Sequence, residues 1–169
     1  IFSINSVETV VHLVFALDPL HDSECMYRIN VESMENVLSY VEKFGVERLV
    51  VTSSGTAYGA YCDNPDLLTE DMPIRGHDYQ YANDKRIIEE KLAEFQSEHS
   101  EVDVVIARPA VICGPHIENF ISRYITKLFV PLVKNSFSRV QLLHEEDAVR
   151  AIYTLVKEAE KGAYNLGPK

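Results

Sequence analysis

Three short stretches rich in valine, leucine and isoleucine, separated by longer helical patterns, restrict the fold of this chain more than any other feature. They cover residues 10–16, 47–54 and 102–109. Strands whose two faces are both covered by helices have this composition, because neither side of the sheet meets water. Strands connected through helices run parallel, with right-handed crossovers. The pattern therefore predicts an α/β fold with a doubly wound parallel sheet.

Two stripes of residues lie between the strands at the three- and four-residue spacing of an amphipathic helix. The first stripe consists of Tyr27, Val31, Met34, Leu38 and Val41. The second stripe consists of Tyr81, Lys85, Ile88, Leu92 and Phe95. The first helix is expected to run to about Phe44, where Gly45 is placed to stop it. Further helices are expected from about 119 to 128 and over 145–158.

Charge and cysteine content narrow the possible partners. The formal net charge is −10 and lysine and arginine form no cluster, which disfavours nucleic acid and acidic membrane surfaces. Cys25, Cys62 and Cys113 are odd in number and form no C-x-x-C pair, so neither a disulfide framework nor a metal site is expected. No apolar run reaches the length of a membrane helix. We expect a cytoplasmic protein with a small-molecule partner.

Polar residues follow the second strand and begin the second helix. Thr52, Ser53 and Ser54 lie at the carboxyl end of the strand, where open parallel sheets bind their ligands. Tyr81 and Lys85 are one helical turn apart on the stripe that faces the sheet. A lysine on a buried stripe is costly unless something compensates its charge. This placement makes the pair a candidate site for proton transfer.

Two other features need separate interpretations. Tyr153 and Lys157 have the same spacing, but Tyr153 lies off the apolar stripe of its helix, so we interpret this second pair as structural. Residues 58–78 contain two glycines and two prolines and are expected to form a long surface loop, a kind of segment that is often functional. His12 lies in an apolar strand and is expected to be a core residue.

Six motifs, in this order, resemble the extended short-chain dehydrogenase/reductase family, in its NAD-dependent sugar epimerase/dehydratase group. They are VVHL, YRINVESMENVL, RLVVTSSGTAYG, YQYANDK, RPAVICGP and LLHEEDAVRAI, and they span nearly the whole chain. The resemblance implies a Rossmann-type sheet and a cofactor, NAD, with NADP as the alternative. Within the family, the sequence is similar to the subgroup that resembles UDP-glucose 4-epimerase.

The resemblance also implies roles for individual residues. Tyr81 matches the general acid/base, Ser54 the hydroxyl that holds the reacting oxygen, and Lys85 the residue that hydrogen-bonds the nicotinamide ribose. A free phenol, with a pKa near ~10, is a poor base at neutral pH unless a nearby cation stabilises the phenolate. Besides Tyr81 and Lys85, the residues expected around the cofactor are Leu13, Val14, Phe15, Asn30, Thr52, Ser53, Pro109, Ala110 and Val111.

The chain departs from the family pattern at both ends. It has no G-x-x-G-x-x-G motif, whose glycines let a helix N-terminus approach the pyrophosphate. By the family's usual spacing, roughly 60 to 70 residues of the first βαβ units are absent, and the C-terminal end is absent as well. We therefore expect residues 1–169 to form a partial NAD(P)-binding domain, with substrate-side elements at 114–139. His144 and Asp147 match a stretch that shapes the substrate side.

The residues directly after Ser54 restrict the type of reaction that is expected. Related dehydratases place acidic residues there, whereas Ser54 is followed by Gly55 and Thr56, which disfavours elimination. A nucleotide-sugar 4-epimerase is the leading hypothesis, although RPAV lacks an asparagine that many such enzymes carry nearby. Two alternatives stay open: a reductase of a small carbonyl compound, and a dinucleotide-sensing regulator without turnover. Helices around 27–43 and 80–98 resemble those of the family's dimer interface, so a homodimer is expected.

Overall fold

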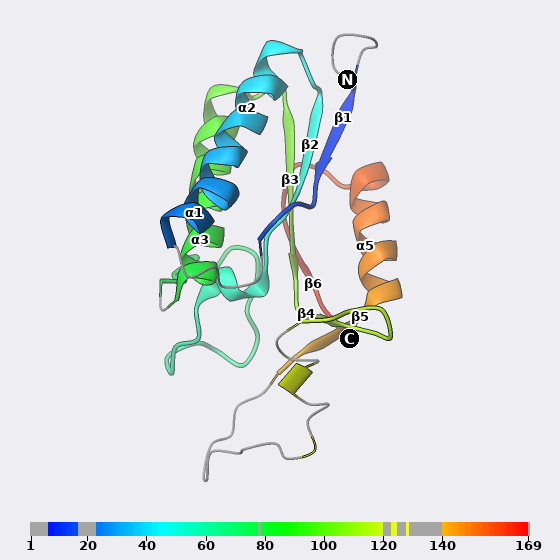
Figure 1. Cartoon of the computed structure of the whole chain (residues 1–169). Helices are drawn as coiled ribbons and strands as arrows, with labels where there is room; N and C mark the ends of the chain where they lie inside the picture. Colours follow the sequence, from blue (N-terminus) through cyan, green and yellow to red (C-terminus); the bar gives the residue numbers. More distant parts are fainter. Residues whose placement is uncertain are drawn as a thin grey trace.

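A four-stranded parallel sheet forms the centre of the molecule (Figure 1). The computed structural model describes residues 7–16, 23–77, 79–119, 123–124, 128 and 140–168. The strands, in their order across the sheet, are β1 (Thr9–His12), β2 (Arg48–Thr52), β3 (Asp103–Pro109) and β6 (Gly162–Leu166). All three neighbouring pairs are parallel. The predicted parallel α/β sheet is confirmed.

Helices cover both faces of this sheet. One face carries α1 (Ser23–Tyr27), a π-helical turn η1 (Arg28–Glu32), α2 (Ser33–Lys43) and α3 (Gln80–Glu98), and the other carries α5 (Glu145–Glu158) (Figure 1). Side chains on β2 alternate between these layers. Leu49 and Val51 join the core under α2 and α3, whereas Val50 joins the core with Leu155 of α5. Burial on both faces explains why the strands are continuously apolar.

The expected end of the first helical pattern and the expected bounds of the last helix agree with the structure. The helix over 145–158 is confirmed as α5, and the first helical pattern ends at Gly45, whose φ of 60° suits glycine. Only residues 119, 123–124 and 128 of the helix expected over 119–128 fall within the described parts, so that expectation lies largely outside them.

The first strand is shorter than its apolar pattern predicts. It ends at His12, and residues 13–16 leave the sheet. Beyond the strand, the backbone N–H of Ala16 donates to Asn30 Oδ1 at 2.9 Å, in a long-range hydrogen bond to the helical layer. The chain therefore turns away from β2 toward the helical layer.

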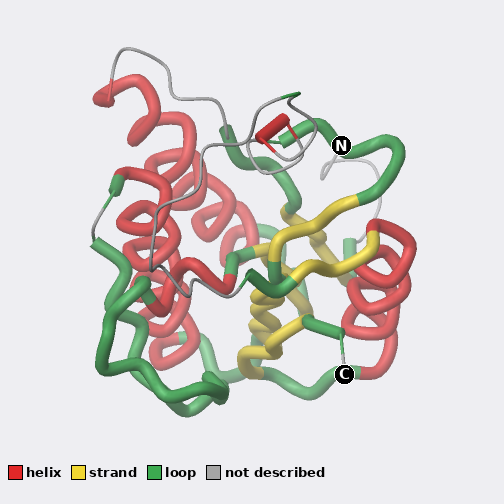
Figure 2. The backbone as a smooth tube through the Cα atoms, turned by 90° about the horizontal axis from the view of Figure 1, so that it is seen from below, coloured by secondary structure: helices red, strands yellow, loops and turns green. Residues whose placement is uncertain are grey.

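The carboxyl ends of the strands meet the long loop and a small second sheet. A single turn of 3-10 helix, η2 (Gly55–Tyr58), follows β2, and β4 (Val111–Cys113) pairs in parallel with β5 (Leu142–His144). Figure 2 views the molecule from this end, with the sheet between its two helical layers. Gly76 packs so closely on η2 that a Cβ atom would lie 2.9 Å from Thr56 O. The loop therefore needs glycine at this contact.

A buried ion pair fixes this loop to the sheet and to α3. Arg108 on β3 binds both carboxylate oxygens of Glu89 on α3, through Nε at 3.0 and 3.1 Å and through Nη2 at 2.6 Å. The two side chains are 7% and 2% exposed. Arg108 Nη1 also donates to the hydroxyl of Tyr58 at 2.6 Å and to the carbonyl of Glu70 at 3.3 Å. The guanidinium of Arg108 thus connects β3 with α3, η2 and the long loop.

Replacing Arg108 with methionine is expected to lower the free energy of unfolding by about 3–5 kcal/mol, because Glu89 is then left as a buried charge without a cation. Urea unfolding monitored by circular dichroism measures this loss. The matched control is Arg150→Met, because Arg150 is 73% exposed and its pair with Glu146 lies on the surface of α5. We expect little measurable change in the control. Equal losses in the two variants would contradict the role given to Arg108.

Candidate active site

The first two turns of α3 carry Tyr81 and Lys85 to the carboxyl end of β2. Their spacing places both on the side of the helix that faces the sheet, as the sequence predicts. Lys85 is 3% exposed, and its Nζ donates to the backbone carbonyl of Thr52 at 2.8 Å. The ring of Phe15, from the segment after β1, lies against the same ammonium, with its centroid 3.8 Å from Nζ. The Tyr81 ring centroid is 5.8 Å from Nζ.

A group of hydroxyls faces Tyr81 from the turn after β2. Ser54 caps η2, and its Oγ accepts hydrogen bonds from Thr56 N at 3.2 Å and from Thr56 Oγ1 at 2.9 Å. The hydroxyls of Ser54 and Thr56 also lie near the phenol of Tyr81 and act to lower its pKa. The structure therefore brings the predicted Ser54, Tyr81 and Lys85 together. It adds Thr56, which sequence reasoning missed, although a hydroxyl two residues after a helix-capping serine is a visible signal.

Burial dominates the electrostatics of this cluster. It lowers the pKa of Lys85 from 10.5 to about 7, against the opposing effect of the nearby carboxylates of Glu89 and Asp84. Burial also raises the pKa of Tyr81 above its usual value, and the nearby hydroxyls of Ser54 and Thr56 act in the opposite direction. The site therefore favours a neutral phenol beside a lysine that is only partly charged at neutral pH.

Asn30 lies near the site and joins the segment after β1 to α3. Its side chain is 1% exposed, and Oδ1 accepts the N–H of Ala16 while Nδ2 donates to Asp84 Oδ2 at 3.1 Å. Gln80 Nε2 donates to the other oxygen of Asp84 at 2.6 Å. That Asn30 contacts the cofactor stays a prediction.

The remaining residues expected at the cofactor differ in how exposed their side chains are. Leu13 and Val14 are 56% and 70% exposed just beyond β1. Ser53 is 3% exposed and its hydroxyl donates to Glu89, so it supports the buried ion pair. Thr52 Oγ1 is similarly occupied, because it donates to the carbonyl of His12 at 3.1 Å.

The segment after β3 also lies at this end of the sheet. Pro109 is buried, whereas Ala110 and Val111 are partly exposed. The backbone N–H of Ala110 donates to the carbonyl of Leu166 at 2.8 Å, which fixes this segment against β6. Among the residues predicted to contact a cofactor, Leu13 and Val14 are exposed and Ala110 and Val111 are partly exposed.

The histidines of the C-terminal half have structural partners. His144 caps α5, because its Nδ1 accepts a hydrogen bond from the N–H of Glu146 at 3.3 Å. His116 Nδ1 lies 2.8 Å from Glu145 Oε1. Asp147 lies in the first turn of α5, 3.5 Å from Arg150 Nη2. The acidic run at this helix start thus stabilises its N-terminus, with a histidine as the cap.

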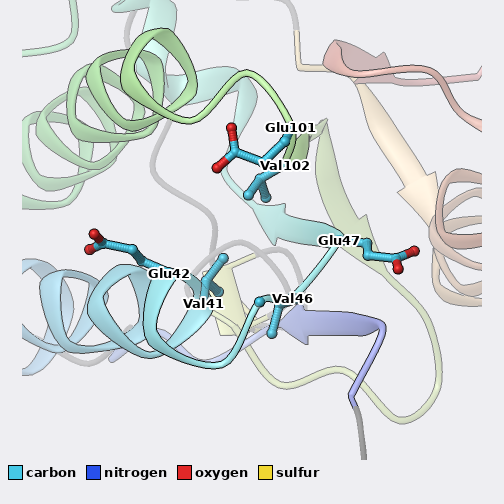
Figure 3. A pocket seen from close by; sticks show the side chains of 7 residues that line it. Val41, Glu42, Val46, Glu47, Glu101 and Val102 are labelled. Carbon is cyan, nitrogen blue, oxygen red and sulfur yellow. The ribbon is translucent and has the colours of Figure 1, made fainter.

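A shallow pocket of about 200 Å³ lies at the opposite end of the sheet from Tyr81 (Figure 3). It is lined by Val41, Glu42, Gly45, Val46, Glu47, Glu101 and Val102. The Glu47 carboxylate points away from those of Glu42 and Glu101, so the three do not converge on one point. Within the described parts of the chain, no group of acidic, histidine or cysteine side chains could hold a metal ion. Among the same residues, no helix has the length and hydrophobicity needed to cross a membrane.

The low pKa of Lys85 predicts a specific pH dependence of stability. Between about pH 7 and 10.5 the unfolded chain binds more protons at this residue than the folded chain, so the free energy of unfolding rises with pH. The slope from one such group is at most about 1.4 kcal/mol per pH unit. We expect Lys85→Met to abolish this contribution when urea unfolding is compared at pH values across this window.

The control is Lys91→Met on the same helix. The ion pair with Glu35 raises the pKa of Lys91, so it stays charged throughout the window and its replacement should leave the slope unchanged. A Lys85→Met variant whose stability followed the same pH dependence as the wild type would show that Lys85 titrates normally.

Comparison with known proteins places these observations in a family. A model of the NAD dependent epimerase/dehydratase family matches residues 1–167. The UDP-glucose 4-epimerase of Bacillus subtilis is 29% identical over 120 residues, which cover 69% of this chain and 34% of that protein.

Two solved structures share the fold. A DesIV double mutant (dTDP-glucose 4,6-dehydratase) from Streptomyces venezuelae, with NAD and DAU bound, matches with a TM-score of 0.80 and 22% identity, over 97% of this chain and 53% of that one. The Thermus thermophilus UDP-glucose 4-epimerase in complex with NAD matches with a TM-score of 0.79 and 19% identity, over 95% of this chain and 56% of that one. The chain thus spans about half the length of these structures. Its sequence belongs to the NAD-dependent epimerase/dehydratase family.

Proposed function

We propose that this chain carries the catalytic residues of an NAD-dependent enzyme that oxidises and re-reduces a carbinol of a nucleotide sugar, in the manner of a UDP-sugar 4-epimerase. The observation that supports this proposal is the cluster of Ser54, Thr56 and Tyr81 hydroxyls beside the buried amine of Lys85. A phenol with two hydroxyls beside it and a lysine one turn away can exchange a proton with a substrate hydroxyl. The family relation and the B. subtilis relative point to the same chemistry.

The residues present fit the nicotinamide half of the cofactor, with one adjustment. Leu13 and Val14 supply exposed apolar surface beyond β1, and Ala110 and Val111 supply partly exposed backbone beyond β3. These four would hold the ring between the ends of two strands, next to Tyr81. Lys85 would bind the ribose only after the ring of Phe15 moves from its Nζ. The bound cofactor would supply a hydride acceptor and, once reduced, a hydride donor.

Tyr81 is the proposed acid and base. Its phenolate would take the proton of the substrate hydroxyl and return it after the carbon has been reduced from the other face. Ser54 and Thr56 would hold the reacting oxygen and stabilise the phenolate through their hydrogen bonds. Lys85, when protonated, would add a positive charge one helical turn away and lower the barrier to forming the phenolate.

In this proposal, residues 1–169 form part of an NAD(P)-binding domain. Residues 114–139 belong to the side of the site that binds the substrate. The long loop beside the site also belongs to this side. Its middle is fixed by β6, because Asn165 Nδ2 donates to the carbonyl of Leu68 at 2.9 Å and Asn165 N donates to Glu70 Oε1 at 2.8 Å. A loop held at its centre can present a constant surface to a sugar, which selectivity for one substrate requires.

Tyr81→Phe is expected to reduce the rate of epimerisation at least ~100-fold, because it removes the proton donor and acceptor while keeping the ring. NAD affinity, measured by titration calorimetry, should change little. The matched control is Tyr79→Phe, because the Tyr79 ring stacks on Tyr81 but is 54% exposed. If the Tyr81→Phe variant retained wild-type turnover, the assignment of the base would be wrong.

The type of reaction is tested with the purified protein and a panel of UDP- and dTDP-sugars. In an epimerase, bound NAD should pass through NADH, followed at 340 nm, without net consumption. Stoichiometric consumption of added cofactor would instead indicate a reductase. Cofactor that binds but is never reduced by any substrate would indicate a regulator without turnover.

We also propose a homodimer that forms through α2 and α3. The outer surface of this layer exposes Tyr40 (48%) and Phe44 (39%), whose rings stack with centroids 5.9 Å apart. Such exposed aromatic surface is typical of interfaces between protein chains. Tyr40→Glu should shift the protein toward the monomer in sedimentation velocity at micromolar concentration, and a wild-type protein that is already monomeric would contradict the proposal.

A further inference from the structure

Phe15 occupies an unusual position for a residue in a segment that is otherwise exposed. Leu13 and Val14 before it point largely into solvent, whereas its own ring lies 3.8 Å from Lys85 Nζ and packs edge-on against Tyr81 at 5.0 Å. The ammonium therefore has Thr52 O as its hydrogen-bond acceptor and an aromatic face beside it.

The position of Phe15 is built into the fold by a chain of buried hydrogen bonds. The backbone N–H of the next residue, Ala16, donates to Asn30, and the amide of Asn30 donates to Asp84. Asp84 is fully buried and directly precedes Lys85 on α3. An asparagine between an N–H donor and a carboxylate has one favourable orientation of its amide. The segment that carries Phe15 is thus fixed to the same helix as the lysine that it covers.

We propose that Phe15 is a positioning residue for Lys85: its ring covers the ammonium, keeps water away from Nζ, and has to be displaced by a ligand before that ligand can reach Nζ. The functional meaning of this cover rests on the proposed function, in which Lys85 binds a ribose. The cover itself is a property of the protein without ligand.

Two physical effects of the ring act in opposite directions on Lys85. Its bulk excludes water, which disfavours the charged amine and lowers the pKa. Its π face attracts a cation, which favours the charged amine. Phe15→Ala removes both effects, whereas Phe15→Leu keeps most of the bulk and removes the π face. The two variants therefore separate exclusion of water from attraction to the ring.

Other charged groups around Lys85 stay in place in both variants. Asp84 and Glu89 face it from α3 and favour the charged amine, and Tyr81 lies one turn before it on the same helix. His12 faces it from β1, and burial together with the positive charge of Lys85 lowers the pKa of His12. Because none of these four is changed, a difference between the variants reports on the ring.

Competitive acetylation of lysines with acetic anhydride, followed by peptide mass spectrometry, measures the cover directly. The labelling of Lys85 as a function of pH gives its pKa from the midpoint and its accessibility from the plateau. In Phe15→Ala we expect the midpoint to rise by about one unit or more and the plateau to rise several-fold. In Phe15→Leu the midpoint should stay or fall, and the plateau should stay within about twofold of the wild type.

A second lysine and a second variant serve as controls. Lys91 on α3 is partly exposed and paired with Glu35, so its labelling should not change in either variant. Phe44→Ala removes a surface ring that lies 5.5 Å from Lys43 Nζ and should leave Lys85 unchanged. If Phe15→Ala fails to fold by circular dichroism, Phe15→Val opens part of the same space and serves in its place.

Two results would overturn the proposal. One is a Phe15→Ala variant whose midpoint and plateau both equal those of the wild type, which would show that the ring does not shield Lys85. The other is a Phe15→Leu variant that behaves like Phe15→Ala, which would show that bulk is not what excludes water. Neither result depends on turnover or cofactor binding, so a failure of the proposed epimerase activity is recognised separately.

Discussion

The geometry of the site depends on the buried ion pair between Arg108 and Glu89. Two charges inside a protein are tolerated only when nearly every donor and acceptor has a partner, and here the partners come from β3, α3, η2 and the long loop. The hydroxyl of Ser53 completes the set around Glu89. Rotation or sliding of α3 would break several charged hydrogen bonds at once. One turn earlier on that helix, Lys85 is therefore held at a fixed distance from the end of β2.

The same ion pair explains why a carboxylate one turn away does not keep Lys85 fully charged. Glu89 lies at the helical spacing that brings side chains together, and its charge favours the ammonium form. Most of that charge is already balanced by the guanidinium of Arg108, which makes three hydrogen bonds to the two carboxylate oxygens. Burial of the lysine consequently prevails, and the pKa falls to about 7.

Features that depend on local periodicity could be read from the sequence. The continuously apolar run of β2 and the stripe on α3 gave correct predictions of the parallel sheet and of the inward direction of Tyr81 and Lys85. Features that depend on long-range hydrogen bonds could not be read from the sequence. Examples are the hydrogen bonds of Asn30 with Ala16 and with Asp84, which join residues 14 and 54 positions apart. The structural role of Arg108 could not be predicted either. Charged residues in a sequence usually lie on the surface, and the partners of Arg108 are distant along the chain.

The two halves of the site differ in how firmly they are built. The hydroxyl half rests on short-range structure, because Ser54 caps η2 and Thr56 lies two residues later. The ammonium half is enclosed by the ring of Phe15, on a segment that Asn30 joins to α3. A side chain can change its rotamer without breaking these hydrogen bonds. A ligand that reaches Lys85 would therefore act first on the ring of Phe15 and leave the hydroxyls where they are.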